Sequence, residues 1–80
     1  MPVILRVDGF KFFFFADEGN EPVHVNIEKG DGAAKFWMKP VRLARNYGMK
    51  ASELSKVRKI VEKNEKLIEG KWIEFSKRKK

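Results

Sequence analysis

The stretch EGNEPVHVNIEKGDGAAKFW, residues 18–37, decides the fold. Apolar and polar side chains alternate over residues 23–28 and again over residues 33–39, a pattern typical of strands with one face in the core. Lys29-Gly30-Asp31-Gly32 lies between the two segments and consists of residues that favour tight turns. We therefore predict an antiparallel pair of strands. Its core-facing positions are Val23, Val25, Ile27, Ala34, Phe36 and Met38.

Two further strands are predicted before this pair, over residues 3–7 and 10–15, with Asp8-Gly9 as the hairpin turn between them. The second of these reads FKFFFF, so aromatic side chains point to both faces of the sheet. A central strand, or a strand covered by a partner, would explain this composition. After Pro40, which marks a break or an edge, VRLARN at residues 41–46 fits either a fifth strand or a helical turn.

From about residue 51 the apolar period becomes that of a helix. Apolar side chains recur at three- and four-residue steps at Leu54, Val57, Val61, Ile68, Trp72 and Phe75. We expect one long helix that kinks or frays near Gly70, without a capping box at its start, because Ser52 is followed three residues later by Ser55.

The expected fold is therefore α+β: an antiparallel sheet of four or five strands followed by one long C-terminal helix packed on one face. The helix should bury its apolar stripe against Leu5, Phe12, Phe14 and the core side of the central strand pair. Residues 1–76 should form a single small domain, and residues 77–80 a basic disordered tail.

The amino-acid composition limits the kinds of site that this protein can form. The 80 residues include no cysteine and one histidine, which excludes disulfides, thiolate metal sites and thiol nucleophiles. No segment approaches the roughly 20 apolar residues that span a bilayer, so we expect a cytoplasmic protein without a membrane partner. The net charge of +7 favours polyanions as partners, although residues 77–80 carry four of these charges, which leaves +3 on the remainder (7 − 4).

Several short segments together resemble a known family. They are Ile4-Leu5-Arg6, the aromatic run at residues 12–15, Pro22-Val23-His24-Val25, Glu28-Lys29-Gly30 and Ala34-Lys35-Phe36-Trp37. Over residues 1–75 the chain resembles DUF4160, a family of small prokaryotic proteins of unknown function. Its members tend to carry a His-x-His pair after a proline, whereas Asn26 occupies the second histidine position here. The resemblance implies a genomic association with toxin–antitoxin pairs.

The face opposite the helix is the first candidate site. Strand parity places cations between aromatic side chains there, a composition found in proteins that stack bases and hold phosphates. The candidate nucleic-acid-binding residues are Lys11, Phe13, Phe15, Asn26, Lys35, Trp37 and Lys39. The alternative is that these aromatic side chains form a second small core against a loop or a protein subunit.

His24 is the candidate catalytic residue, because an imidazole can act as a general acid or base near neutral pH. The alternative is a surface histidine that is hydrogen-bonded to a neighbour. A third candidate is a ridge formed by Lys56, Lys59, Lys63 and Lys66 on the outer side of the helix, which is more typical of an ordinary solvated surface.

These observations favour binding over catalysis. We expect a small basic interaction module, a component of a toxin–antitoxin-like pair that binds a protein partner or a second copy of itself, with nucleic acid as a further candidate partner. The alternative is a small ribonuclease that uses His24 as its general acid/base. No cofactor or metal is expected.

Overall fold

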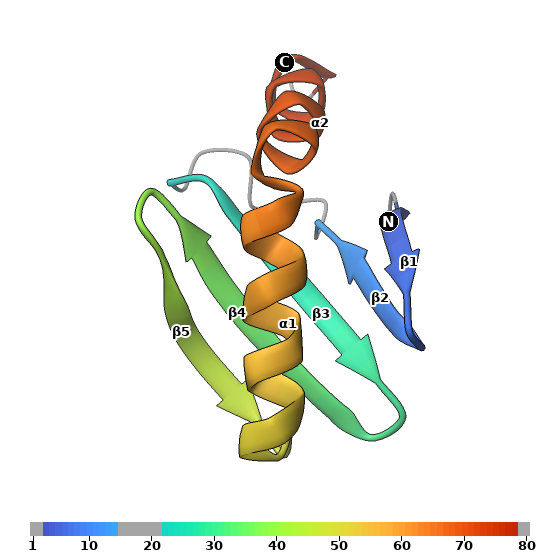
Figure 1. Ribbon diagram of the computed structural model, residues 1–80. Coiled ribbons are helices and arrows are strands. Elements are labelled where there is room, and N and C mark those ends of the chain that lie inside the picture. The colour runs from blue at the N-terminus through green and yellow to red at the C-terminus, as the bar shows by residue number, and fades with distance from the viewer. Residues whose placement is uncertain (1–2, 15–21, 79–80) are drawn as a thin grey trace.

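The computed structural model describes residues 3–14 and 22–78. It contains a five-stranded antiparallel sheet followed by two helices (Figure 1). The elements are β1 (Val3–Val7), β2 (Phe10–Phe13), β3 (His24–Lys29), β4 (Gly32–Met38), β5 (Val41–Tyr47), α1 (Ala51–Lys63) and α2 (Glu65–Arg78). The strands are ordered β1-β2-β3-β4-β5, so each one lies beside its neighbour in the chain. The predicted α+β class is confirmed.

The turns lie where the sequence places them. Asp8 and Gly9 both have positive φ, 52° and 82°, between β1 and β2, and Gly30 has a φ of 59° between β3 and β4. Positive φ at both central residues is the geometry of the two-residue hairpin that suits twisted strands. Pro40 lies in the turn between β4 and β5, after a cis peptide bond. The segment after it is a strand, which decides between the two predicted alternatives.

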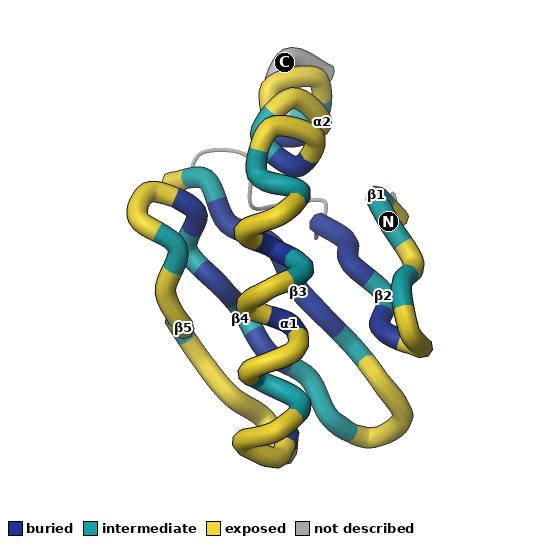
Figure 2. Tube along the Cα trace, in the orientation of Figure 1, coloured by how far each residue is buried: buried dark blue, intermediate teal, exposed yellow. Residues whose placement is uncertain are grey.

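The core lies between α1 and one face of the sheet. The alternation predicted for the central pair is confirmed, because Val25, Ile27, Ala34, Phe36 and Met38 are all buried in one cluster. That cluster also contains Phe10, Phe12, Phe14, Met49, Val57, Val61, Ile68 and Trp72, with Leu5 and Leu54 partly buried against it. Figure 2 shows that β2, β3 and β4 are largely buried, whereas β5 and the outer side of α1 are exposed.

The prediction of one long helix is wrong, because the helix breaks at Asn64. The Asn64 side-chain Nδ2 donates a hydrogen bond of 2.8 Å to the Ile60 carbonyl, and its backbone N–H donates to the carbonyls of Ile60 and Val61. These bonds cap the end of α1, as side chains of this type do at helix termini. The Asn64 carbonyl then accepts from the Ile68 N–H, 3.0 Å away, and α2 begins.

Gly70, where a kink was expected, lies inside α2. The chain instead changes direction at Asn64, and Figure 1 shows α2 at the end of the sheet where β2 ends and β3 begins. The start of α1 has the acidic half of a capping box, since the Lys50 N–H donates to the Glu53 carboxylate at 3.0 Å. The backbone of α2 continues to Arg78, so the first residues of the predicted tail are helical, and residues 79–80 lie outside the described ranges.

Candidate interaction site

The face of the sheet opposite α1 has the composition that strand parity predicts. One row across the strands contains Phe13, Asn26, Lys35 and Arg45, which are paired in register. The next row contains His24, Trp37 and Arg42. The register therefore places most of the predicted site residues together, while Phe15 lies outside the described residues.

Two residues of the predicted nucleic-acid surface are buried. Phe13 is only 1% exposed, and Asn26 is also buried, with its side-chain Nδ2 3.4 Å from the Phe13 carbonyl oxygen. A side chain that stacks on a base must offer an accessible face, and Phe13 offers none. Phe13 and Asn26 are therefore not exposed as a stacking surface requires, and the burial of Phe13 fits the alternative of a second small core. Alternation identifies the face on which a side chain lies but not whether that face is covered.

His24 is completely buried, with an exposed fraction of 0%. Its Nδ1 lies 2.9 Å from the Pro22 carbonyl oxygen, and because a carbonyl only accepts hydrogen bonds, Nδ1 is the protonated nitrogen in this contact. The ring also packs against both tryptophans of the chain. Its centroid is 5.6 Å from Trp37, edge to face, and 4.9 Å from Trp72 of α2. His24 therefore joins the sheet to α2, and the surface histidine considered from the sequence is not what the structure shows.

Lys11, another predicted site residue, already has two neighbours. Its Nζ lies 3.2 Å from the Glu28 carboxylate and 5.3 Å from the centre of the Phe13 ring. Lys11 and Glu28 are paired across β2 and β3, so this ion pair follows directly from the register. The nearby Glu28 carboxylate offsets part of the positive charge of Lys11.

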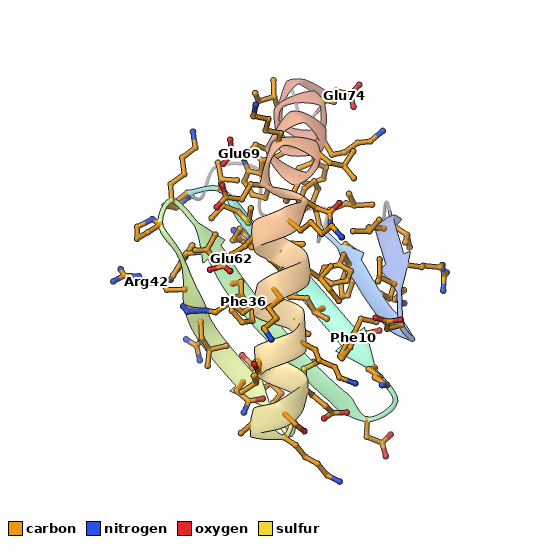
Figure 3. The ribbon with its side chains drawn as sticks, viewed as in Figure 1. Phe10, Phe36, Arg42, Glu62, Glu69 and Glu74 are labelled. Carbon is orange, nitrogen blue, oxygen red and sulfur yellow. The ribbon has the colours of Figure 1, made fainter. Side chains whose placement is uncertain are left out.

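Trp37 lies beside a hollow of about 480 Å³ at the other end of the face. Pro22, Val23 and Trp37 form its apolar lining, and Lys39 and Arg42 add positive charge. The Lys35 Nζ lies 4.9 Å from the centre of the Trp37 ring. Figure 3 shows Arg42 pointing away from α1 at the side of the sheet. The predicted Lys35, Trp37 and Lys39 are thus close together.

Sequence reasoning missed the two arginines of β5. Arg42 and Arg45 pair with Trp37 and Lys35 of β4, so they lie on the same face as the predicted residues. The ambiguity of residues 41–46 hid them, because the face of a side chain is undefined until its segment is known to be a strand. A bulge next to Leu43 brings the two arginines to one face although their numbers differ by three.

A second surface lies on the α1 side of β5. Within residues 3–14 and 22–78, β5 is hydrogen-bonded to β4 alone and forms an edge of the sheet. A groove of about 390 Å³ runs between β5 and α1, lined by Phe36, Leu43, Ala51, Leu54, Ser55 and Arg58. Leu43 remains 41% exposed there, and Tyr47 of the same strand is also exposed. This is an edge strand next to an apolar groove that α1 leaves partly open.

The lysine ridge is an ordinary solvated surface in the structure. Lys56, Lys59, Lys63 and Lys66 are all exposed, on two helices that point in different directions. The break at Asn64 separates Lys66 from the first three, so the four lysines do not form one continuous line.

Among the described residues, no group of three or more histidine, cysteine, aspartate or glutamate side chains is arranged to hold a metal ion. In the same part of the chain, neither helix combines the length and apolar character needed to cross a membrane.

Comparison with known proteins gives one match. A family model described as "Domain of unknown function (DUF4160)" matches residues 9–73, which include every strand from β2 onwards, α1 and most of α2. This match confirms the resemblance seen in the sequence. No curated protein and no solved structure matches the chain.

Proposed function

This chain belongs to the DUF4160 family, and we propose that it is a small basic interaction module that binds a protein partner, as one component of a toxin–antitoxin-like pair. The observation that supports this proposal best is the edge strand β5 beside the apolar groove under α1. An edge strand presents backbone N–H and C=O groups that a strand from another protein can pair with.

The groove would give such pairing its specificity. When a strand adds to a sheet edge, backbone hydrogen bonds supply affinity, and pockets for alternate side chains select the partner. Leu43 is exposed at the groove, and Phe36 and Leu54 extend the apolar lining towards the core. Arg58 crosses from α1 to β5, where its Nη2 donates to the Val41 carbonyl at 3.2 Å, and it forms part of the groove lining.

The charges near β5 indicate the character of the partner. The strand sequence VRLARNY contains two arginines and no acidic residue. Arg58 is the positive charge at the groove itself, because Arg42 and Arg45 lie on the other face of the sheet. Complementary charge steers association and selects against unsuitable partners. We therefore propose an acidic partner segment with an apolar side chain that enters the groove.

Co-expression with the product of the adjacent gene tests the proposal, with light scattering after size exclusion as the measurement. Leu43→Asp should weaken the complex by about 2 kcal/mol or more, roughly thirtyfold, because it places a charge in an apolar contact. Leu67→Asp is a matched control, since Leu67 on α2 is the same residue type and is also 41% exposed. This control should leave the complex intact.

The results distinguish the possible partners. A chain that self-associates, and loses that association only in Leu43→Asp, would assign the surface to a second copy of itself. A complex that survives Leu43→Asp but is lost in Leu67→Asp would contradict the proposal. Thermal melting of both variants alone checks that each one is folded.

The ribonuclease alternative receives no support from the geometry. A general acid or base must reach the proton that it transfers, directly or through one water molecule. His24 is covered on all sides and packs between two tryptophan rings. A packing role explains its burial without requiring any substrate.

A further inference from the structure

We propose that the hollow beside Trp37 is a nucleotide-binding site, where a base lies against Trp37 and Val23 and the phosphate is held by Lys39 and Arg42. Its volume of about 480 Å³ is in the range of small-molecule sites in proteins. It is separate from the groove under α1, because Trp37 and Arg42 face the opposite side of the sheet from Leu43.

Trp37 supplies a preorganised aromatic wall. Its backbone is held in the centre of the sheet between β3 and β5, and the edge-to-face contact with the buried His24 ring fixes the indole. The side chain is only half-buried and lines the hollow. A ring that is already packed against a neighbour loses less conformational freedom when a ligand binds than a fully exposed ring would.

Arg42 and Lys39 supply the charge that a phosphate needs. Arg42 is paired in register with Trp37, so its guanidinium can reach a phosphate attached to a base at the indole. Lys39 is highly exposed, and its Nζ is 3.8 Å from the Glu69 carboxylate, a loose surface pair of the kind that contributes little. Lys35 is not one of the proposed ligand contacts, because its Nζ already interacts with the Trp37 ring.

The combination of groups identifies the ligand class. An aromatic wall alone would suit any apolar ring, and cations alone would suit any anion. A nucleotide has both a planar ring and a phosphate, which matches Trp37 beside Arg42. Because Phe13 in the neighbouring row is buried, the described part of this face offers one base position rather than a row of them. The ligand is therefore a free nucleotide or one nucleotide of a single strand.

Titration at about 50 mM salt tests this site with two probes, adenosine monophosphate and a fluorescently labelled single-stranded adenylate oligomer. Trp37→Leu should weaken binding by about fivefold to 150-fold, the range measured for loss of one stacked base. Trp37→Phe keeps a ring and should retain most of the binding. Circular dichroism of both variants shows whether the fold is intact.

A charge-matched pair of variants tests the role of the two cations. The double variants Lys39→Gln/Arg42→Gln and Lys56→Gln/Lys59→Gln each lower the net charge from +7 to +5 (7 − 2). All four positions are exposed, so neither pair should disturb the core. Only the Lys39→Gln/Arg42→Gln pair should weaken binding. For the oligomer, the plot of log affinity against log salt concentration should become less steep by about 0.7 for each phosphate that the protein no longer neutralises.

The two probes distinguish the source of the nucleotide. Equal affinity for both probes would indicate a free nucleotide, and tighter binding of the oligomer would indicate a single strand. Either outcome supports the site if Trp37→Leu weakens the binding. Absence of binding to both probes at low salt would overturn the proposal. So would an equal loss of binding in the Lys56→Gln/Lys59→Gln variant, because general charge attraction would then explain the affinity.

Discussion

Replacement of Trp72 by alanine should destabilise this protein more than any substitution on its surface. Trp72 of α2 is only 5% exposed, and its ring packs against Phe14, directly after β2, and His24, the first residue of β3. Its ring centroid is 5.0 Å from that of Phe14, at an angle of 89°, and 5.7 Å from that of Phe75. His24 lies 4.9 Å away on the β3 side. The indole thus joins α2 to the paired strands β2 and β3.

The expected cost follows from this environment. Truncation of a buried tryptophan to alanine costs about 3–5 kcal/mol, with larger values where the surroundings cannot collapse into the space. Phe14, Phe75 and His24 approach the indole from different segments, so the closure of the cavity would require several elements to move. A domain of 80 residues typically has a total stability of about 4–12 kcal/mol. The substitution should therefore remove about a quarter or more of that stability.

Urea unfolding followed by far-ultraviolet circular dichroism measures this loss. The midpoint should fall with little change in slope, and the melting temperature should fall by at least about 12 °C, at roughly 4 °C or more per kcal/mol for a domain of this size. Ile73→Ala is the control, because Ile73 is the next residue of α2 and is 55% exposed. It should cost less than about 1 kcal/mol. A Trp72→Ala protein as stable as the Ile73→Ala control would refute the assignment of the indole to the core.

Two other substitutions test local features of the fold. Gly70→Ala should raise the free energy of unfolding by about 0.5–1 kcal/mol, because Gly70 lies inside α2 and a Cβ there meets no atom within 4 Å. An unchanged or lower melting temperature would contradict a regular helix at this position. Asn46→Ala should lower the free energy of unfolding by about 1–2 kcal/mol, because the side chain accepts from the Met49 N–H at 2.9 Å and donates to the Met49 carbonyl at 3.1 Å. Asn46→Asp keeps only the first bond, so urea unfolding should place it between the alanine variant and the original protein.

The strands could be predicted because their signals are local. Alternation of side chains and the glycine turns at Gly9 and Gly30 specify the hairpins, and the structure has both turns with the positive φ that they require. The core-facing positions of β3 and β4 follow from the same alternation, whereas the burial of His24 and Asn26 on the other face does not. The fifth strand was ambiguous, because VRLARN has no strict alternation and its bulge next to Leu43 shifts the period.

The break between the helices could not be predicted from periodicity, since the apolar stripe from Val57 and Val61 to Ile68 and Trp72 stays in phase across it. The sequence did contain one signal for the break. The stripe contains Asn64 at a place where an apolar residue would be expected, and asparagine competes with the helix by bonding to nearby carbonyl groups. Its effect depends on the packing of Trp72 at the end of the sheet, which is a tertiary contact.

The candidate site was predicted in part. Lys35, Trp37 and Lys39 lie on the expected face, and Trp37 and Lys39 both line the hollow. The sequence left Phe13 open between an accessible stacking surface and a second small core, and it placed His24 at the surface. Both residues are buried, because the covering of a face depends on segments far away in the chain.

The consecutive order of the strands has a consequence for how the chain reaches its fold. Because every strand of β1 to β5 pairs with its neighbour in the sequence, each pairing closes only a short loop, and the entropy lost on closure is small. Contacts within each helix are also local, although Trp72 adds contacts with Phe14 and His24, which are far away in the chain. Mean sequence separation between contacting residues governs folding rates across small domains, and low values correspond to fast folding. We therefore expect the hairpins of this architecture to form early, with β5 as an edge strand once it pairs with β4.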